Sequence, residues 1–319
     1  MTIDLENPPK KALRKQFGET LVALGAENPN VVVLDADLAC STQTQMFGEQ
    51  YPDRFFNQGI AEQDLVNTAA GLATTGKIPF CSTFALFASG KAWDQIRNSV
   101  CYSGLNVKIA PTHSGLSLGE DGASHQSIED IALMRVIPGM TVVVPSDAVE
   151  TDRVVRWAAA YDGPVYIRLV RPDCPVIHEE SYQLDGQKIR VERAGTDLTI
   201  VGTGETVYHA LLAAERLQKD HGVSAEVLNC LFIKPMDEAT LIASARKTGR
   251  VVTVESHQTM AGLGGAVCEV LSEHCPTPVK RLGTQDRFGQ SGTASALFRE
   301  YGIDWQAIAE TSLDWVKSR

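Results

Sequence analysis

The sequence lacks several features that would place the protein in a membrane, outside the cell or on a metal framework. No apolar run approaches the ~20 residues of a membrane-spanning helix. The first 20 residues alternate charges with prolines and contain no apolar signal core. The cysteines number seven, an odd count, and form no Cys-x-x-Cys pair, which predicts reduced thiols rather than disulfides or a zinc site. We therefore expect a cytoplasmic protein.

Positive charge is also scarce. The chain has 29 Lys and Arg against 39 Asp and Glu, a net charge of −10, and no basic run longer than Lys10-Lys11. Such a balance argues against nucleic acid or an anionic membrane as the main partner. Anionic metabolites stay possible, because a few arginines in one pocket can override a distant negative field.

The length and the apolar content predict an ordinary globular protein of two domains. The chain has 319 residues, and a domain usually takes about 150. Hydrophobic residues make up 44% and charged residues 21%, a mix typical of proteins with sizeable cores.

Short apolar strands alternate with helices in two successive series. This pattern predicts the α/β class, with two domains in series, each a mostly parallel sheet flanked by helices. Pro172, Pro175 and Gly186 fall in a stretch without clear periodicity, 171–193, which predicts a linker. We place a first domain at 1–175, the linker at 176–192 and a second domain at 193–319.

The predicted elements are as follows. The first series has strands at 31–34, 78–82, 107–111, 141–144 and 165–169, and helices at 10–27, 62–75, 88–102 and 147–161. Ser127-x-x-Asp130 and Asp147-x-x-Glu150 have the form of capping boxes that open helices. The second series has strands at 198–201, 225–228, 251–254 and 279–282, and helices at 205–219, 237–247, from 263, 293–301 and 305–308.

The densest group of chemically active residues is the segment 112–126, which follows the predicted strand 107–111. It contains two histidines, two acids and three glycines. Loops at the carboxyl ends of parallel strands bind ligands in α/β proteins, and histidine transfers protons near neutral pH. The alternative is a surface loop of polar turn residues.

Three other motifs are ambiguous when taken singly. Glu62 opens an apolar helix after Gly59, where an acid is also favoured by the helix dipole. Phe84 and Phe87 follow a short strand, where core packing is the simpler explanation. The turn Gly202-Thr203-Gly204-Glu205 lacks the third glycine of a dinucleotide fingerprint and the lysine of a P-loop.

Taken in series, these motifs resemble the thiamine-diphosphate enzymes of the transketolase family. The order and spacing of three motifs match those of the family: Gly59-Ile60-Ala61-Glu62-Gln63, then Ser82-Thr83-Phe84-x-x-Phe87, then Gly119-Glu120-Asp121-Gly122-x-x-His125-Gln126. The resemblance spans nearly the whole chain. It corresponds, however, only to the carboxyl-terminal half of a full transketolase, which is the pyrimidine-binding domain plus the C-terminal domain.

The family's diphosphate-binding domain is absent from this sequence. Its Gly-Asp-Gly stretch, with an asparagine downstream, holds the metal and the diphosphate, and no Gly-Asp-Gly occurs here. The resemblance therefore implies one subunit of a split transketolase, with no metal ligands of its own. The cofactors implied are thiamine diphosphate and Mg²⁺. The partner implied is an N-terminal subunit, in an assembly such as α₂β₂.

The resemblance also assigns residues to the cofactor. Glu62 matches the carboxyl that faces N1′ of the cofactor pyrimidine and activates it. Phe84 and Phe87 match aromatic residues that wall the aminopyrimidine. Asp37 matches a position that contacts the cofactor across the dimer, although a turn residue after the strand is the alternative.

On the sugar side, the resemblance implies transfer of a two-carbon ketol unit from a phosphorylated ketose to an aldose. His125 matches the histidine placed for proton transfer, and Asp121 the acid that reads a donor hydroxyl. The phosphate grip of the family is matched by four residues: Arg14, Ser41, His113 and Arg171. Arg14 has the weakest local motif, and a solvated helix residue is the alternative.

Several departures leave the substrates and the exact relative open. Cys40 stands where the family usually has proline, and Arg168 adds a basic residue also found in deoxyxylulose phosphate synthases. A subunit of that enzyme, the β subunit of a 2-oxoacid dehydrogenase and a non-catalytic assembly partner are the alternatives. The first typically has a second histidine where Gln126 stands, and the second lacks Gly-Glu-Asp-Gly. The segment Arg287–Gly292 also resembles the family, without an assigned role.

Overall fold

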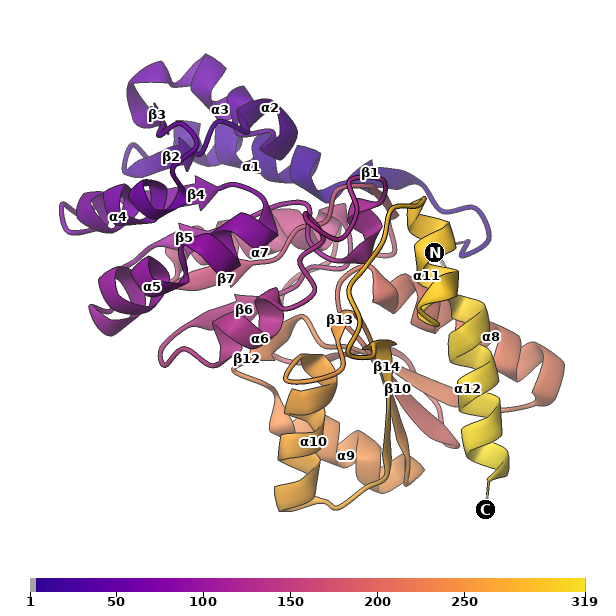
Figure 1. The fold of residues 1–319 in the computed structure, drawn as a ribbon. Coiled ribbons are helices and arrows are strands. Elements are labelled where there is room, and N and C mark those ends of the chain that lie inside the picture. Colours follow the sequence, from indigo (N-terminus) through magenta and orange to yellow (C-terminus); the bar gives the residue numbers. More distant parts are fainter. Residues whose placement is uncertain (1–3, 319) are drawn as a thin grey trace.

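The computed structural model describes residues 4–318 and has two parallel sheets side by side (Figure 1). The larger sheet has seven strands in the order β12-β6-β7-β5-β4-β2-β3. All neighbours are parallel except β12, which runs antiparallel to β6. The strands are β2 (Val31–Asp35), β3 (Phe55–Asn57), β4 (Ile78–Ser82), β5 (Lys108–Ile109), β6 (Thr141–Val143), β7 (Val165–Ile167) and β12 (Phe232–Lys234).

Helices cover both faces of this sheet, as the uniformly apolar strands predict. Val31 and Val33 of β2 pack with α1 (Leu13–Glu27) and α7 (Ala148–Ala160) on one face. Val32 and Leu34 pack on the other face with α4 (Glu62–Ala73) and α6 (Asp130–Arg135). Three short helices complete the domain: α2 (Ala39–Thr42), α3 (Gln45–Gln50) and α5 (Trp93–Gln95).

The second sheet has five strands in the order β14-β13-β10-β11-β9. They are β9 (Arg190–Arg193), β10 (Leu198–Gly202), β11 (Ala225–Asn229), β13 (Val251–Gln258) and β14 (Val279–Thr284), and only β9 is antiparallel to its neighbour. The helices are α8 (Thr206–His221), α9 (Glu238–Thr248), α10 (Leu263–His274), α11 (Ala294–Glu300) and α12 (Trp305–Lys317). The predicted α/β class with two mostly parallel sheets is confirmed.

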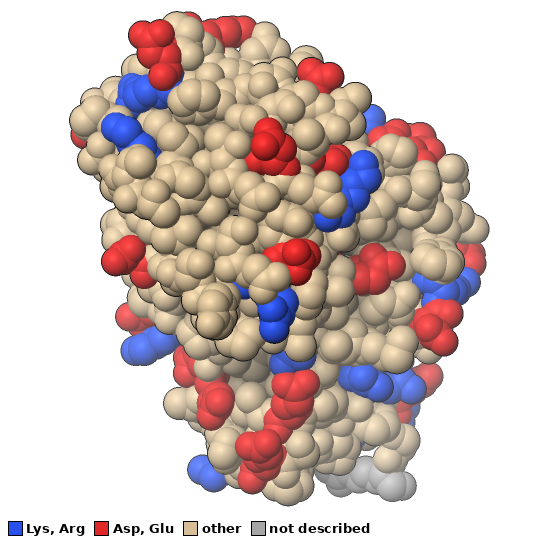
Figure 2. All heavy atoms as spheres, turned by 60° about the vertical axis from the view of Figure 1, so that its left-hand side comes forward, with Lys and Arg blue, Asp and Glu red and all other residues tan. Residues whose placement is uncertain are grey.

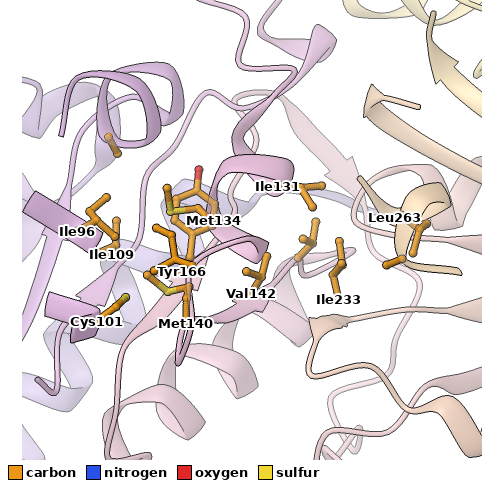
Figure 3. Packing of buried hydrophobic residues seen from close by; sticks show 14 of the residues in the cluster. Ile96, Cys101, Ile109, Ile131, Met134, Met140, Val142, Tyr166, Ile233 and Leu263 are labelled. Carbon is orange, nitrogen blue, oxygen red and sulfur yellow. The ribbon is translucent and has the colours of Figure 1, made fainter. Parts of the chain in front are cut away.

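The two halves of the chain share a hydrophobic core. Ile233 of β12 and Leu263 of α10 belong to the same buried cluster as Ile131, Val142 and Tyr166 of the first half (Figure 3). The antiparallel pairing of β12 with β6 adds backbone hydrogen bonds to this apolar contact. The second half of the chain therefore packs directly against the first sheet.

Two expectations near the ends of the first series are wrong. The helix predicted from residue 10 begins at Leu13, because β1 (Lys10–Ala12) pairs antiparallel with β8 (Asp173–Pro175). The stretch predicted to be irregular contains β8 and β9, each stabilised by a strand from a distant segment. Such pairing leaves no local periodicity to detect.

The predictions around residues 88–130 need three corrections. The predicted single helix is two π-helical segments, Phe87–Lys91 and Ile96–Tyr102, separated by α5. The predicted strand 107–111 shortens to β5. Ser127 does not cap α6, whose N-cap residue is Glu129, whereas Asp147 caps α7 by accepting a hydrogen bond from the Glu150 amide, as predicted.

The surface carries charges of both signs in small groups. On the face drawn in Figure 2, Lys and Arg lie scattered among Asp and Glu and form no continuous basic strip. Among the described residues, no helix is long and apolar enough to cross a membrane.

Candidate active site

Apart from Arg14, which lies in α1, the candidate residues lie in the segments that follow five neighbouring strands of the larger sheet. Ser41 follows β2, Glu62 follows β3, Phe84 follows β4, His113 follows β5 and Arg171 follows β7. Because the strands are parallel, their carboxyl ends meet at one edge, where α/β sheets bind ligands. The sheet topology thus explains why residues far apart in the sequence lie together.

Glu62 is a buried carboxylate at the first position of α4. It follows Gly59, whose φ of 69° only a glycine adopts without strain, and its side chain is 7% exposed. Lys91 places its Nζ 3.4 Å from Oε1 and 3.5 Å from Oε2. Within residues 4–318, no other side chain pairs with this carboxylate.

Aromatic rings line the space beside Glu62. The ring of Phe84 lies between His113, stacked at a centroid distance of 3.9 Å, and Phe87, stacked at 5.8 Å. His125 meets Phe87 edge-on at 5.5 Å. Offset and edge contacts of this kind fix the orientation of each ring. Phe84 is buried, whereas Phe87 keeps part of its ring open.

Two arginines lie close together near His113. Arg14 donates from Nη1 to the Ser41 carbonyl at 2.7 Å and from Nε to the Arg171 carbonyl at 3.2 Å. Burial and the nearby Arg171 lower the pKa of Arg14. Backbone carbonyls therefore hold two like charges close together, an arrangement that favours an anion carrying two negative charges.

His113 is held as a neutral, strained residue beside these cations. Its φ is 63°, its Nδ1 lies 2.7 Å from the Thr112 hydroxyl, and burial, Arg14, Arg171 and His125 lower its pKa to about 3. A non-glycine residue with this backbone conformation costs free energy that the surrounding packing must supply, and such residues cluster at functional sites.

Arg171 is partly exposed, with 38% of its side chain open to solvent. Its Nη1 donates to the Leu118 carbonyl at 2.9 Å and lies 3.4 Å from Glu120 and 4.0 Å from Asp121. Asp121 is exposed, so its carboxylate is free to face a ligand. Contacts, in part through Lys91, thus connect nine of the ten predicted site residues at this edge of the sheet.

Asp37 is the exception among the predicted residues. It is exposed, has a φ of 63°, and exchanges hydrogen bonds with Asn57: its amide donates to Oδ1 at 3.1 Å, and Nδ2 donates to its carboxylate at 3.3 Å. The described contacts join it to none of the other candidates. The buried Asp35 instead shapes the loop that presents Ser41, by accepting hydrogen bonds from Leu38 and two threonines.

Gln126 connects the segment of unassigned role, Arg287–Gly292, to the site. Its Nε2 donates to the Gln290 carbonyl at 3.0 Å, and Gly289 lies so close to its amide oxygen that a Cβ would not fit. The segment therefore braces the loop that carries Asp121 and His125. The sequence analysis identified both the motif that ends at Gln126 and the segment Arg287–Gly292, but it could not predict that they are in contact.

Arg168 does not join the arginine pair. It is buried, and its guanidinium donates to Asp130 at 2.8 Å and to the carbonyls of Ser127 and Ser256. This arginine ties the two halves together instead of facing a ligand.

Two other candidate sites find no support. The Gly202–Glu205 turn is buried, with Gly204 against Val144 of the first half, which leaves no room for a nucleotide. In the described part of the chain, no three His, Cys, Asp or Glu residues are grouped so as to hold a metal ion.

Comparison with known proteins identifies the family of this chain. The family model "Transketolase, pyrimidine binding domain" matches residues 9–176, and "Transketolase, C-terminal domain" matches residues 187–308. Together they take in both sheets. The chain therefore belongs to the transketolase family.

Relatives in this family match the chain over nearly its whole length. A "putative transketolase C-terminal section" of Methanocaldococcus jannaschii is 49% identical over 96% of this chain and 97% of its own length. One subunit of an apulose-4-phosphate transketolase of Phocaeicola vulgatus is 38% identical over 96% of this chain and 98% of its own length. Human transketolase is 38% identical, but this chain spans only 48% of it. A solved split-gene transketolase, described as an inactive β4 tetramer, has a TM-score of 0.89 at 49% identity, over 96% of this chain and 98% of that one.

Proposed function

We propose that this chain is the pyrimidine-binding subunit of a thiamine-diphosphate-dependent transketolase. The observation that carries the proposal is the buried Glu62 carboxylate, which Lys91 links to Phe87, at the same edge of the sheet as His125 and the Arg14–Arg171 pair. A cofactor-activating acid, a proton-transfer residue and an anion site thus follow one another along a single edge of the sheet. Residues 1–175 would form the pyrimidine-binding domain, 176–192 the linker and 193–319 the C-terminal domain.

The cofactor fits the residues that surround Glu62. When bound, thiamine diphosphate supplies the carbon nucleophile that carries the two-carbon unit. Phe87, partly open, offers a ring face to the aminopyrimidine, while Phe84 fixes the angle of Phe87 from behind. Glu62 shares a proton with N1′ of the pyrimidine, and its buried position favours this sharing over exchange with water. Asp37, exposed beside β3, is available to the cofactor of a neighbouring copy.

The substrate is a phosphorylated sugar. Arg14, Arg171 and the neutral His113 supply donors to a phosphate dianion, and Ser41 borders them. His125, half-buried against Phe87, transfers protons to substrate oxygens, and Asp121 accepts a hydrogen bond from a donor hydroxyl.

The diphosphate and its Mg²⁺ belong to a second subunit. The described residues provide no cluster for a metal, and a bare diphosphate binds poorly without one. Relatives of the same length are named as transketolase sections or subunits. We therefore expect an N-terminal partner and a two-fold assembly such as α₂β₂, with the sites at subunit interfaces.

Arg171→Ala tests the phosphate assignment in the assembled enzyme. We expect KM to rise roughly 10- to 150-fold for a phosphorylated sugar, because a lost charge-assisted contact costs about 1.5–3 kcal/mol. The KM of the unphosphorylated sugar should change little. Steady-state kinetics on matched sugars measures both values.

Lys15→Ala is the matched control, since Lys15 is an exposed cation next to Arg14 on the same helix. It should leave both KM values unchanged. An equal rise of KM for both sugars in Arg171→Ala would show that Arg171 does not bind the phosphate.

A further inference from the structure

Among residues 4–318, the Lys91 ammonium interacts with two side chains, and the proposed function assigns both of them to the cofactor. Its ammonium lies 3.4 Å from the Glu62 carboxylate and 4.8 Å from the centroid of the Phe87 ring. Phe87 and Lys91 are the first and last residues of a π-helical turn, and residues four positions apart on a helical turn lie on the same face. The Lys91 side chain thus pairs with the Glu62 carboxylate and at the same time covers a face of the Phe87 ring.

An aminopyrimidine needs the same two groups. Its ring stacks on the open face of Phe87, and its N1′ approaches Glu62. A cation that lies within contact distance of both occupies the space between them. The ring and the ammonium therefore exclude one another.

We propose that Lys91 is a displaceable cation that fills the pyrimidine subsite of the unliganded chain and competes with the incoming ring. This inference rests on the proposed function. It gives Lys91 a positioning role that sets cofactor affinity. In the unliganded chain, its ammonium compensates the charge of the buried Glu62 and covers Phe87.

The geometry makes this cation easy to displace. The Lys91 side chain is 54% exposed, and its flexible stem can carry the ammonium into solvent. Both of its Nζ–carboxylate distances are long for a charge-assisted hydrogen bond, which usually measures about 2.7–2.9 Å. A half-exposed pair of this kind contributes little free energy, so a ring that stacks and hydrogen-bonds can replace it.

The test uses the full chain and the isolated aminopyrimidine half of the cofactor, 4-amino-5-hydroxymethyl-2-methylpyrimidine. Binding is followed by ligand-observed NMR, without partner, diphosphate or turnover. We expect Lys91→Ala to lower the Kd about two- to fivefold, the range that a partly exposed ion pair allows. The difference should shrink as salt is raised, because salt screens the pair that wild type must break.

Two control variants separate charge from general perturbation. Lys91→Arg keeps the cation and should bind the probe like wild type. Arg97→Ala removes an exposed cation from the next π-helical segment and should have no effect.

The remaining outcomes contradict the inference in distinguishable ways. If Lys91→Ala binds the probe as tightly as wild type or more weakly, the proposed competition is wrong, but the proposed pyrimidine site is unaffected. Failure of wild type and all variants to bind the probe overturns both the competition and the proposed pyrimidine site.

Discussion

Glu62→Gln should lower kcat at least ~100-fold in the assembled enzyme at saturating thiamine diphosphate, because positioned proton transfer contributes about 10²–10⁴-fold to rate. The amide has the same shape as the carboxyl but cannot share a proton with N1′. Because the carboxylate pairs only with the half-exposed Lys91 among the described residues, its loss should leave the fold intact. Circular dichroism and steady-state kinetics measure the two effects.

Asp64→Asn is the matched control for this prediction. Asp64 is an exposed acid in the first turn of the same helix. It should retain near wild-type turnover. A Glu62→Gln enzyme with near wild-type kcat would remove Glu62 from the mechanism.

Arg168→Met should destabilise the chain by about 3–5 kcal/mol, the cost of leaving a buried partner charge unpaired. Arg168 and Asp130 are both fully or nearly fully buried, and Arg168 also satisfies carbonyls from both halves of the chain. The variant removes the cation and leaves the buried Asp130 carboxylate without its ion-pair partner. Urea unfolding followed by circular dichroism gives the change in unfolding free energy.

The double variant Arg168→Met with Asp130→Asn provides the control. Because it removes both charges, it should recover part of the stability lost in the single variant. A single-variant loss below ~1 kcal/mol would show that the buried pair does not tie the halves together.

The alternation of strands and helices could be predicted because it is a local signal. Strands buried on both faces read as unbroken apolar runs, and β2, β4 and β10 fall within a residue of their predicted ends. Pairings between distant segments left no such signal. The antiparallel strands β1, β8 and β12 depend on partners far along the chain, so their residues read as helix or irregular structure.

In the candidate site, too, residues in local motifs could be predicted, whereas contacts between distant segments could not. Glu62, Phe87 and His125 could be predicted because each lies in a contiguous motif. The contact of Lys91 with Glu62 could not, because the two residues lie 29 positions apart on different helical segments and only the packing of those segments brings them together. The buried partner of Arg168 could not be predicted either, because Asp130 lies 38 positions away.

The central claim is that this chain provides the pyrimidine half of a thiamine-diphosphate site and that a second subunit completes it. Calorimetric titration of the purified chain with thiamine diphosphate and Mg²⁺, run beside a coupled ketol-transfer assay, tests it most directly. We expect weak binding and no turnover for the chain alone. Tight binding and turnover should appear together when a partner with Gly-Asp-Gly and its downstream asparagine is added. Tight binding with turnover by this chain alone would contradict the claim.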